Sequence, residues 1–567
     1  MAVIEDGCVN SSDKDSQQFT LDSILEHIGQ FGKFQIRNFA LLIPPMLFNA
    51  YFMYSYIFVA SPAVHRFENK ECLFCLVFKF CLTLTRCRVP ECDGPNSVFE
   101  ESWINFTIPR TIDGDLDKCK RYVPYNRSSD MCFADNYDKM SKEGCGKDFI
   151  FRDSETPISK DFQIYCSAEF KLSLVGTVSV AGQFIGAPVG GYFSDRYGRR
   201  TTVAIGGFLS AFLGLIRSFT SNYYFFLSLA FVEHVCGGVI YGTLFIIALE
   251  LVNEKGRALS CLFLTTFFCF GEVLLALAAK NISNWRWILR IAYIPALGHI
   301  SLLWLLPESV RWLLSQEDYE KVAKILRNAA KTNKRKLSNS TIEHLFIENQ
   351  YQLGKSNKWE LEFPIKTAFK TFPCRILNCA LCWFSNILVY HGLTLNSQIL
   401  GGNKYDNFMY SALVEVPANI LLYFTLNRFG RRYSLCIYLL ICGICLGSSI
   451  FLDSDFYILQ LSLFLVGKLA ISLSLQVLYF FTSEIFPTNV RNSLLSFCVM
   501  FGKVGSMVAP QTALLANYNK SAPTILFSSV AIVSGLMALL FPETTNVVLP
   551  ATLDEAENII SHSKNNK

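Results

Sequence analysis

Charged residues are scarce in this chain. Only 17% of its 567 residues are Asp, Glu, Lys or Arg, and 51% are hydrophobic, whereas soluble domains carry about 25% charged residues. This scarcity excludes a disordered chain, a fibrous protein and a string of soluble domains. The net charge of +5 is small for the length, and the cations lie beside apolar runs, so nucleic acid is not expected as a partner.

Motifs for catalysis and nucleotide binding are also lacking. The sequence has no GxxxxGK[ST] phosphate loop, which argues against ATP-driven transport, and it has neither zinc-ligand spacing nor a nucleophile elbow. We therefore expect no enzyme activity, no metal and no cofactor, and a coupling ion, if there is one, is not identified. A cleavable signal peptide is not expected either, because residues 1–37 are polar and the first apolar run is full length.

Long apolar runs dominate what is present. A transmembrane helix needs about 20 apolar residues to cross the hydrocarbon layer, and twelve runs approach or exceed this length. They lie at about 38–60, 170–193, 201–219, 223–251, 258–279, 286–306, 374–395, 406–427, 433–452, 456–481, 493–515 and 523–542. The sequence therefore predicts an all-α polytopic membrane protein with 12 transmembrane helices in two six-helix halves.

The positive charges of the short loops predict the orientation. Arg196, Arg199, Arg200, Arg428, Arg431, Arg432 and Arg491 all fall on one side. We expect the protein to lie in the plasma membrane, with that side facing the cytoplasm. The cytoplasmic side would also hold the N-terminus (1–37), a helical loop (307–372) and the tail (543–567). The first helix (38–60) then leads to an extracellular segment (61–168), followed by helices 2–6 (170–306) and 7–12 (374–542).

The outer segment 61–168 supports this orientation. It holds nine cysteines, which predict disulfides in an oxidising compartment. Because nine is odd, at least one stays free or pairs elsewhere, and the connectivity is left open. Sequons at Asn105 and Asn126 predict glycosylation.

A loop motif recurs in the two halves. Its first copy contains Gly191, Asp195, Arg196, Gly198, Arg199 and Arg200, and its second contains Arg428, Gly430, Arg431 and Arg432. The halves also end alike, on Pro307-Glu308 and Pro542-Glu543. We interpret the motif, with Glu484 and Arg491, as a gating set on the cytoplasmic side. Repeated halves are typical of major facilitator transporters.

The chain resembles the organic cation, organic anion and carnitine transporter family (solute carrier family 22) of the major facilitator superfamily. The residues that carry the resemblance are 24–35, 284–287, 307–314, 410–417 and 483–491, together with the cysteine-rich outer segment. Two positions depart from the family pattern: Asn427 replaces an acid of the second loop motif, and Ala230 stands near a common arginine.

Charges inside the apolar runs are the main functional candidates, because each costs at least ~2.5–3.5 kcal/mol on insertion scales. They are Glu233, Glu272, Glu415, Lys468 and Lys503. The resemblance implies that Lys503 occupies a position where a charge sorts substrates, and a lysine there implies an anionic or carboxylate-bearing substrate. It also implies that Glu415 follows the cation and carnitine branches. The predicted substrate-binding residues are Lys503, Glu415, Tyr390, Glu272, Lys468 and Trp383.

Two alternatives concern these charges. Lys503 could pair with Glu415 or Glu272 and contact no substrate, and Glu272 could pair with Lys468 rather than bind a cation.

These observations favour a transporter that moves small organic ions by alternating access, with a carnitine-like zwitterion or an organic anion as the favoured substrate. An organic cation transporter is the alternative, and a transport-inactive receptor or scaffold on the same fold is the alternative of another class. The expected partners are the substrate and the lipid bilayer; a monomer is compatible with the sequence, which does not determine the oligomeric state.

Overall fold

The computed structural model describes most of the chain from Leu21 to Glu543. The described residues are 21–29, 31–60, 85–93, 102–110, 116–117, 119–125, 132–145, 149–151, 156–253, 256–356, 369–398, 400, 402–452, 456–486, 491–519 and 521–543.

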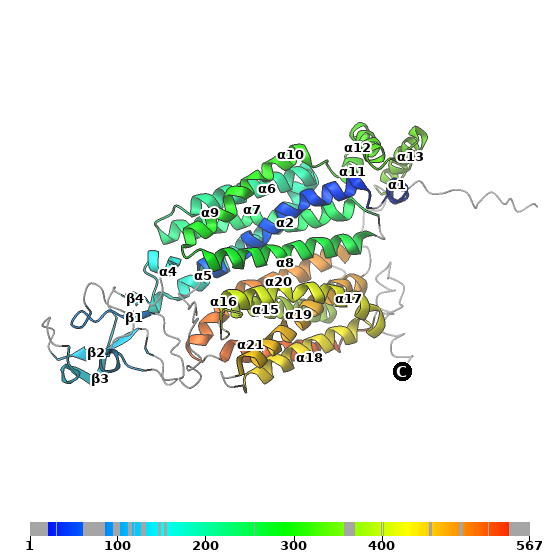
Figure 1. The fold of residues 1–567 in the computed structure, drawn as a ribbon. Coiled ribbons are helices and arrows are strands. Elements are labelled where there is room, and N and C mark those ends of the chain that lie inside the picture. The colour runs from blue at the N-terminus through cyan, green and yellow to red at the C-terminus, as the bar shows by residue number, and fades with distance from the viewer. Residues whose placement is uncertain are drawn as a thin grey trace, which may run out of the picture.

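Two groups of helices lie side by side along the length of the bundle (Figure 1). The first lobe contains α2 (Lys33–Val59), α5 (Phe170–Tyr197), α6 (Arg199–Arg217), α7 (Tyr223–Glu250), α8 (Arg257–Asn281) and α9 (Trp285–Ala296), which continues through η4 (Leu297–Ser301) into α10 (Leu302–Leu305). The second lobe contains α15 (Pro373–Asn396), α16 (Lys404–Leu413), α17 (Glu415–Phe429), α18 (Arg431–Ser449), α19 (Tyr457–Ile485), α20 (Arg491–Thr512), η6 (Ala513–Asn517) and α21 (Ala522–Ala538).

These elements supply the membrane spans. Within the described residues, nine helices are long and apolar enough to cross a membrane, and α6, the α16–α17 pair and α21 occupy the remaining predicted positions. The predicted fold class is confirmed. The eighth run, predicted as one helix, is divided at Val414 into α16 and α17.

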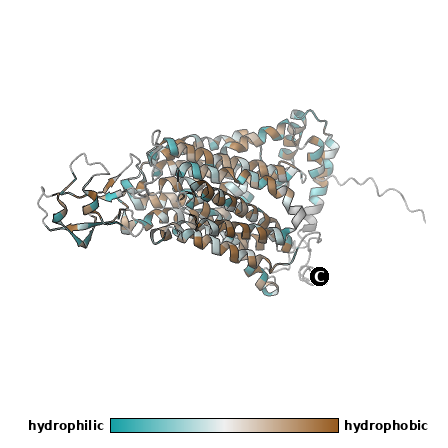
Figure 2. Ribbon diagram, turned by 60° about the horizontal axis from the view of Figure 1, so that its bottom comes forward, coloured by the Kyte–Doolittle hydropathy of each residue, from teal (hydrophilic) through white to brown (hydrophobic). Residues whose placement is uncertain are grey.

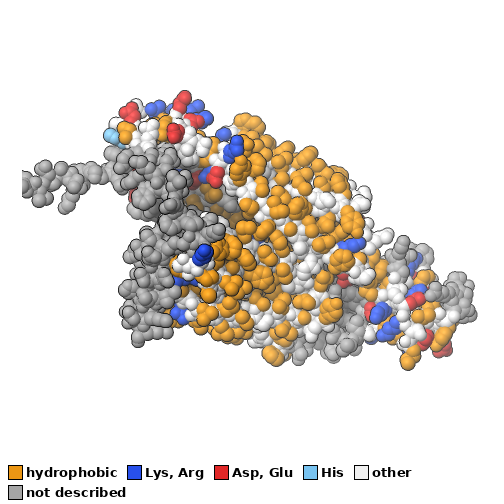
Figure 3. Space-filling view, turned by 180° about the vertical axis from the view of Figure 1, so that it is seen from behind, with side chains coloured by type: hydrophobic (Ala, Val, Ile, Leu, Met, Phe, Trp, Pro, Cys, Tyr) orange, Lys and Arg blue, Asp and Glu red, His pale blue; other side chains and the backbone are white. Residues whose placement is uncertain are grey.

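Each lobe has its own apolar core. The first centres on residues such as Leu42, Leu244 and Tyr293, and the second on residues such as Trp383, Leu439 and Phe527. Large apolar side chains also cover the outside of the bundle (Figure 3). Trp304, Phe424 and Leu540 are among the most exposed of them. Hydrophobic residues fill the bundle, and the hydrophilic colours gather toward its two ends (Figure 2). An apolar outer surface of this extent fits lipid contact, so the protein is a multi-pass membrane protein.

Short helices cover one end of the bundle, which we call the α12 end. They are α1 (Leu21–Ile28), α11 (Val310–Ser315), α12 (Tyr319–Thr332) and α13 (Asn339–Ser356), and they share a small apolar core (Figure 1). Asn333 connects this group to the bundle, because its side chain accepts from the backbone N–H of Phe34 at 2.9 Å and donates to Gln35 at 2.9 Å.

The opposite end, which we call the disulfide end, carries a small β-domain. Antiparallel pairs form between β1 (Thr85–Cys87) and β4 (Phe149–Phe151), and between β2 (Lys120–Pro124) and β3 (Tyr137–Gly144). The short helices α3 (Ile104–Thr107) and α4 (Ile158–Asp161) and the 3₁₀ turns η1 (Ala134–Asn136) and η2 (Cys166–Ala168) complete it.

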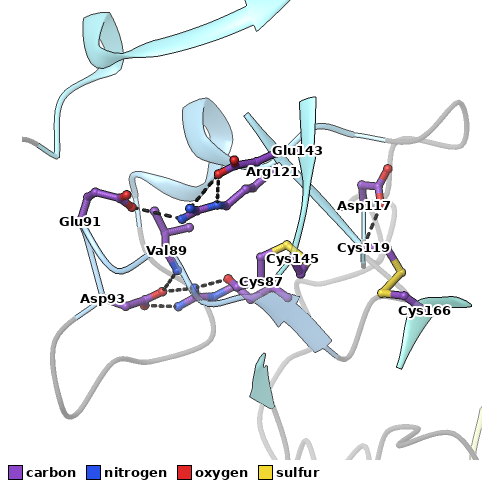
Figure 4. Close-up of a disulfide and its surroundings, with 11 residues drawn as sticks. Cys87, Val89, Glu91, Asp93, Asp117, Cys119, Arg121, Glu143, Cys145 and Cys166 are labelled. Atoms are coloured by element: carbon purple, nitrogen blue, oxygen red, sulfur yellow. Dashed lines mark hydrogen bonds and ion pairs between the residues drawn. A yellow bond between two sulfur atoms is a disulfide. The ribbon is translucent and has the colours of Figure 1, made fainter. Parts of the chain in front are cut away.

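Three disulfides cross-link this domain: Cys87–Cys145, Cys92–Cys132 and Cys119–Cys166. Figure 4 shows the first and the third of these disulfides. The last one attaches the strands to the start of α5. Figure 4 also shows Arg121 between Glu91 and Glu143, at 3.2 and 2.7 Å. The disulfides predicted for the segment are present; Cys72, Cys75 and Cys81 lie outside the described residues. Asn105 is exposed on α3, whereas Asn126 lies outside the described residues, so glycosylation stays a prediction.

Candidate functional site

An ion pair is buried at the face that the second lobe turns toward the first. Glu415, in the first turn of α17, forms an ion pair with Lys468 of α19 at 2.9 Å, and their side chains are 11% and 1% exposed. The division of the eighth span at Val414 gives Glu415 a helix N-terminus, where the helix dipole favours a carboxylate. The ion pair and this helix end together offset part of the cost of desolvating the two charges.

Tyr390 of α15 completes this arrangement. Its hydroxyl donates to Glu415 Oε2 at 2.9 Å, and Lys468 Nζ lies 3.6 Å from the centre of its ring. Lys468 also donates to Thr394 Oγ1 at 2.7 Å. Hydrogen bonds and a cation–π contact therefore hold the ammonium on three sides.

The first lobe contributes residues of α8 and α2. Cys269 Sγ lies 3.8 Å from Glu415 Oε2, and Glu272 interacts electrostatically with both Glu415 and Lys468. The backbone of α8 approaches α2 closely at Gly271, where a Cβ would lie 2.5 Å from the carbonyl oxygen of Leu47. This close approach fixes the position of Glu272 between the lobes.

Glu272 differs from Glu415 in its partners. It is 2% exposed, and its Oε1 has no hydrogen-bond partner among the described residues. The sequence left open a pairing of Glu272 with Lys468, and the structure gives the direct ion pair to Glu415 instead. We call Glu272, Glu415, Lys468 and Tyr390 the interlobe cluster.

The other two predicted substrate residues lie elsewhere. Lys503 on α20 is partly buried, close enough to His391 for an electrostatic interaction, and makes no ion pair among the described residues. Trp383 is fully buried in the second lobe, where its Nε1 donates to Thr482 at 2.9 Å and its ring contacts Tyr479. The structure thus brings four of the six predicted residues together.

The repeated loop motif, for which a gating role is predicted, forms two matching turns at the α12 end. Gly198 and Gly430 both have positive φ, +97° and +77°, which glycine adopts without strain. After each turn, a glutamate from the end of the same lobe accepts a hydrogen bond from a backbone N–H in the first turn of the next helix. Glu308 accepts from the backbone N–H of Arg200 at 3.0 Å, and Glu543 from that of Arg431 at 3.0 Å.

The charged side chains of the motif pair within their own lobe. Arg199 bonds Asp195 at 2.8 Å and lies 3.7 Å from Glu250, and Arg431 pairs with Glu484 at 3.2 Å. Arg196 donates to the hydroxyl of Tyr192, and Gly191 lies exposed on α5. The side chains of Arg428 and Arg491 are outside the described part of the chain.

Sequence reasoning missed a buried charge network inside the first lobe. Arg217 at the end of α6 pairs with Glu233 of α7 at 3.0 Å, and both side chains are 1% exposed. Tyr293 of α9 donates to Glu233 and accepts from Arg217 at 3.2 Å. The available signal was an arginine inside the apolar run 201–219, one run before Glu233. We call these three residues the first-lobe triad.

The lobes meet at the disulfide end. Lys280 of α8 bonds Asp406 of α16 at 2.8 Å, and Phe58 of α2 stacks on Tyr405. Gln511 of α20 donates to Thr177 of α5 at 2.9 Å. These contacts close the bundle on that side of the interlobe cluster.

Comparisons with known proteins agree with this architecture. The model of the sugar (and other) transporter family matches residues 122–555. Over nearly its whole length the chain is similar to an organic cation transporter protein of Drosophila melanogaster, with 29% identity covering 95% of this chain and 94% of the relative. It is also similar to solute carrier family 22 member 7 of Rattus norvegicus, with 28% identity covering 94% and 98%.

Solved structures share the fold. The inward-open xylose transporter XylE from E. coli superposes with a TM-score of 0.55 at 19% identity, covering 71% of this chain and 93% of that one. A D-xylose–proton symporter gives 0.53 at 19% identity, covering 69% and 92%.

Proposed function

Because the chain belongs to the sugar (and other) transporter family, and to solute carrier family 22 of the major facilitator superfamily, we propose that it carries small organic ions with a carboxylate, zwitterions above all, by alternating access. Its relatives are transporters and it is not an enzyme. The proposal includes a plasma-membrane location with both termini in the cytoplasm.

The observation that carries the proposal is the balance of charges between the lobes. Glu415 and Lys468 neutralise each other at 2.9 Å, which leaves Lys503 as a partly buried cation without an ion pair in the described part of the chain. At 4 Å and an intermediate dielectric, opposite unit charges attract by about 4 kcal/mol. A substrate carboxylate is a suitable partner for Lys503.

Aromatic side chains favour the ammonium half of a zwitterion. The ring of Tyr390 already holds one ammonium, that of Lys468, at 3.6 Å, and each such contact contributes about 0.5–2 kcal/mol. The same ring and the carboxylate of Glu415 also support an organic cation as the second candidate substrate class.

Alternating access would use the contacts at the two ends. In the present arrangement the lobes are joined at the disulfide end by Lys280–Asp406 and Phe58–Tyr405. The opposite state would break these contacts and bring the paired turns of the α12 end together. Each turn is a rigid unit because a carboxylate from its own lobe binds it, so the lobes can move as bodies.

The test is tracer uptake by cells that express the chain, with carnitine, tetraethylammonium and aminohippurate as zwitterionic, cationic and anionic probes. Lys503→Ala should lower carnitine and aminohippurate uptake about tenfold, which corresponds to about 1.4 kcal/mol. Lys503→Asp should also raise the ratio of tetraethylammonium to carnitine uptake. Lys324→Ala, on the exposed face of α12, is the control that should leave all three unchanged.

Two outcomes would contradict the proposal. Unchanged selectivity in both Lys503 variants would remove Lys503 from substrate recognition. No uptake of any probe by protein shown at the cell surface would favour the transport-inactive scaffold.

A further inference from the structure

Glu272 is a buried carboxylate without an ion pair or a hydrogen bond of its own in the described part of the chain. Its side chain is enclosed at 2% exposure, and Oε1 makes no hydrogen bond among the residues that the structure describes. An ionised carboxylate in such a place loses its hydration and receives only a longer-range attraction from Lys468, which is already paired with Glu415, so its burial is costly. An unpaired acid retained between two lobes that move therefore calls for a ligand.

The charges around Glu272 define what that ligand must be. Across the lobe interface lie Glu415 and Lys468, and Lys468 is committed to Glu415 at 2.9 Å. The three groups together carry one negative charge in excess when both acids are ionised. The missing species is therefore a single positive charge.

Size decides which cation this is. Glu272 is only 2% exposed in this state, and a proton can bind a carboxylate without any cavity, which an organic ammonium would need. We propose that Glu272 binds one proton that crosses the membrane with the substrate in each cycle, so that the transporter is a proton symporter. This inference rests on the proposed transport function and specifies its coupling ion.

The other titratable groups around Glu272 come from α8 itself and from the neighbouring helices α2 and α15. Tyr54 of α2 and Tyr390 of α15 interact with it electrostatically, as does Cys269 on its own helix. His391 of α15 lies 3.4 Å from the Tyr54 hydroxyl and interacts with Lys468 and Lys503. The neighbouring carboxylate Glu415 accepts a hydrogen bond from Tyr390. Glu272 Oε1 accepts none among the described residues.

The proton step balances without any other reagent. In the state open at the disulfide end, α8 separates from α16 and α17, and a proton from water forms the O–H bond on Glu272. After the lobes close there, Lys468 can pair with only one of the two carboxylates. When it turns to Glu272, that O–H bond breaks and the proton passes to water on the α12 side.

The test uses the full-length protein in proteoliposomes with carnitine as the probe. Carnitine keeps its charge above about pH 5, because carboxylic acids titrate near pH ~4. An inward gradient of about one pH unit can then drive up to about tenfold accumulation, the equivalent of 1.36 kcal/mol. Carnitine added to wild-type protein should also make the external medium more alkaline.

Variants separate the proton site from the substrate site. Glu272→Gln should abolish accumulation under the gradient, and Glu272→Asp, which keeps the carboxyl, should retain it. Glu233→Gln alters a buried carboxylate of the same lobe that has an ion pair with Arg217 and a hydrogen bond from Tyr293, and protein that inserts into the membrane should still accumulate carnitine. If Glu272→Gln is not inserted, the wild-type proton flux and the Glu272→Asp variant decide.

The outcomes that overturn the inference differ from those that overturn the proposed function. Carnitine that equilibrates but never accumulates under a pH gradient, or unchanged accumulation by Glu272→Gln, refutes proton coupling while transport stands. Uptake that disappears when sodium is replaced by N-methylglucamine, with no response to pH, assigns the site to sodium instead. No uptake of any probe refutes the proposed function and this inference together.

Discussion

Two buried charge networks differ in where their members lie: the first-lobe triad is contained in one lobe, whereas the interlobe cluster is shared between both lobes. In the first-lobe triad, Glu233 is bound by both Arg217 and Tyr293, and all three belong to one lobe. In the interlobe cluster, Glu272 belongs to the first lobe, its neighbours belong to the second, and its Oε1 has no partner among the described residues.

Under the proposed transport cycle, this difference would separate a structural ion network from one that takes part in transport. A lobe that moves as a rigid body can keep its internal ion pairs closed throughout the cycle, so a complete set of partners costs it nothing in function. A charge that lies between two moving lobes must change partners, and a permanently satisfied group could not do so. Incomplete pairing at an interface is thus the more informative sign of function.

The largest effect that tests this comparison is expected for Lys468→Met. The change leaves Glu272 and Glu415 without their cation, and removing one partner of a buried pair costs about 3–5 kcal/mol. Thermal stability should fall accordingly, and uptake per molecule at the surface should be lost, because Lys468 can no longer pair with either carboxylate during the proposed cycle. In the double variant Lys468→Met with Glu415→Gln, the thermal stability of the detergent-solubilised protein should recover, whereas uptake should not. Full uptake by Lys468→Met alone would show that the interlobe cluster is dispensable.

A smaller and purely structural effect is expected for Arg217→Met. Glu233 would lose its ion pair but keep the hydrogen bond from Tyr293, so the loss should be about 3 kcal/mol of stability, at the low end for buried pairs. Less protein should reach the surface, and the Tm should fall. The double variant Arg217→Met with Glu233→Gln should recover most of the lost stability. The KM for carnitine should stay unchanged in every variant. A shifted KM would place the first-lobe triad in substrate recognition.

The smallest effect is expected at the partly exposed pair Lys280–Asp406, whose side chains are 30% and 26% exposed. Pairs of this kind contribute about 0.2–1 kcal/mol. Asp406→Lys should change the initial uptake rate by no more than about fivefold, and more so at low salt. The charge swap Lys280→Asp with Asp406→Lys should return the rate toward wild type, and purely additive effects would show that the pair does not join the lobes.

The sequence indicates which charged residues are candidates for the site, but not which of them pair with one another. Glu272, Glu415 and Lys468 stand out in the sequence because each interrupts an apolar run at a cost. Their pairing could not be read, because a helix rotates by 100° per residue and the apolar composition of a span does not fix which face meets its neighbour. The same limit left Trp383 among the substrate candidates, although it packs inside the second lobe.

Tertiary detail decided other elements that the sequence left open or misread. The run 406–427 is apolar throughout and was predicted as one helix, yet it divides at Val414 and so presents Glu415 at a helix start. The three disulfide pairings were among many that nine cysteines allow.

The sequence by itself determined the membrane class, the two halves and the paired loop motifs. Those features follow from the hydrocarbon thickness and from the need to satisfy every backbone group within a helix, which act on each segment alone. Only the tertiary structure decided that Lys468 is committed to Glu415 and that Glu272 is enclosed without a partner for its Oε1 among the described residues. Such pairing depends on helices far apart in the chain meeting at one depth and one rotation, which no local pattern encodes.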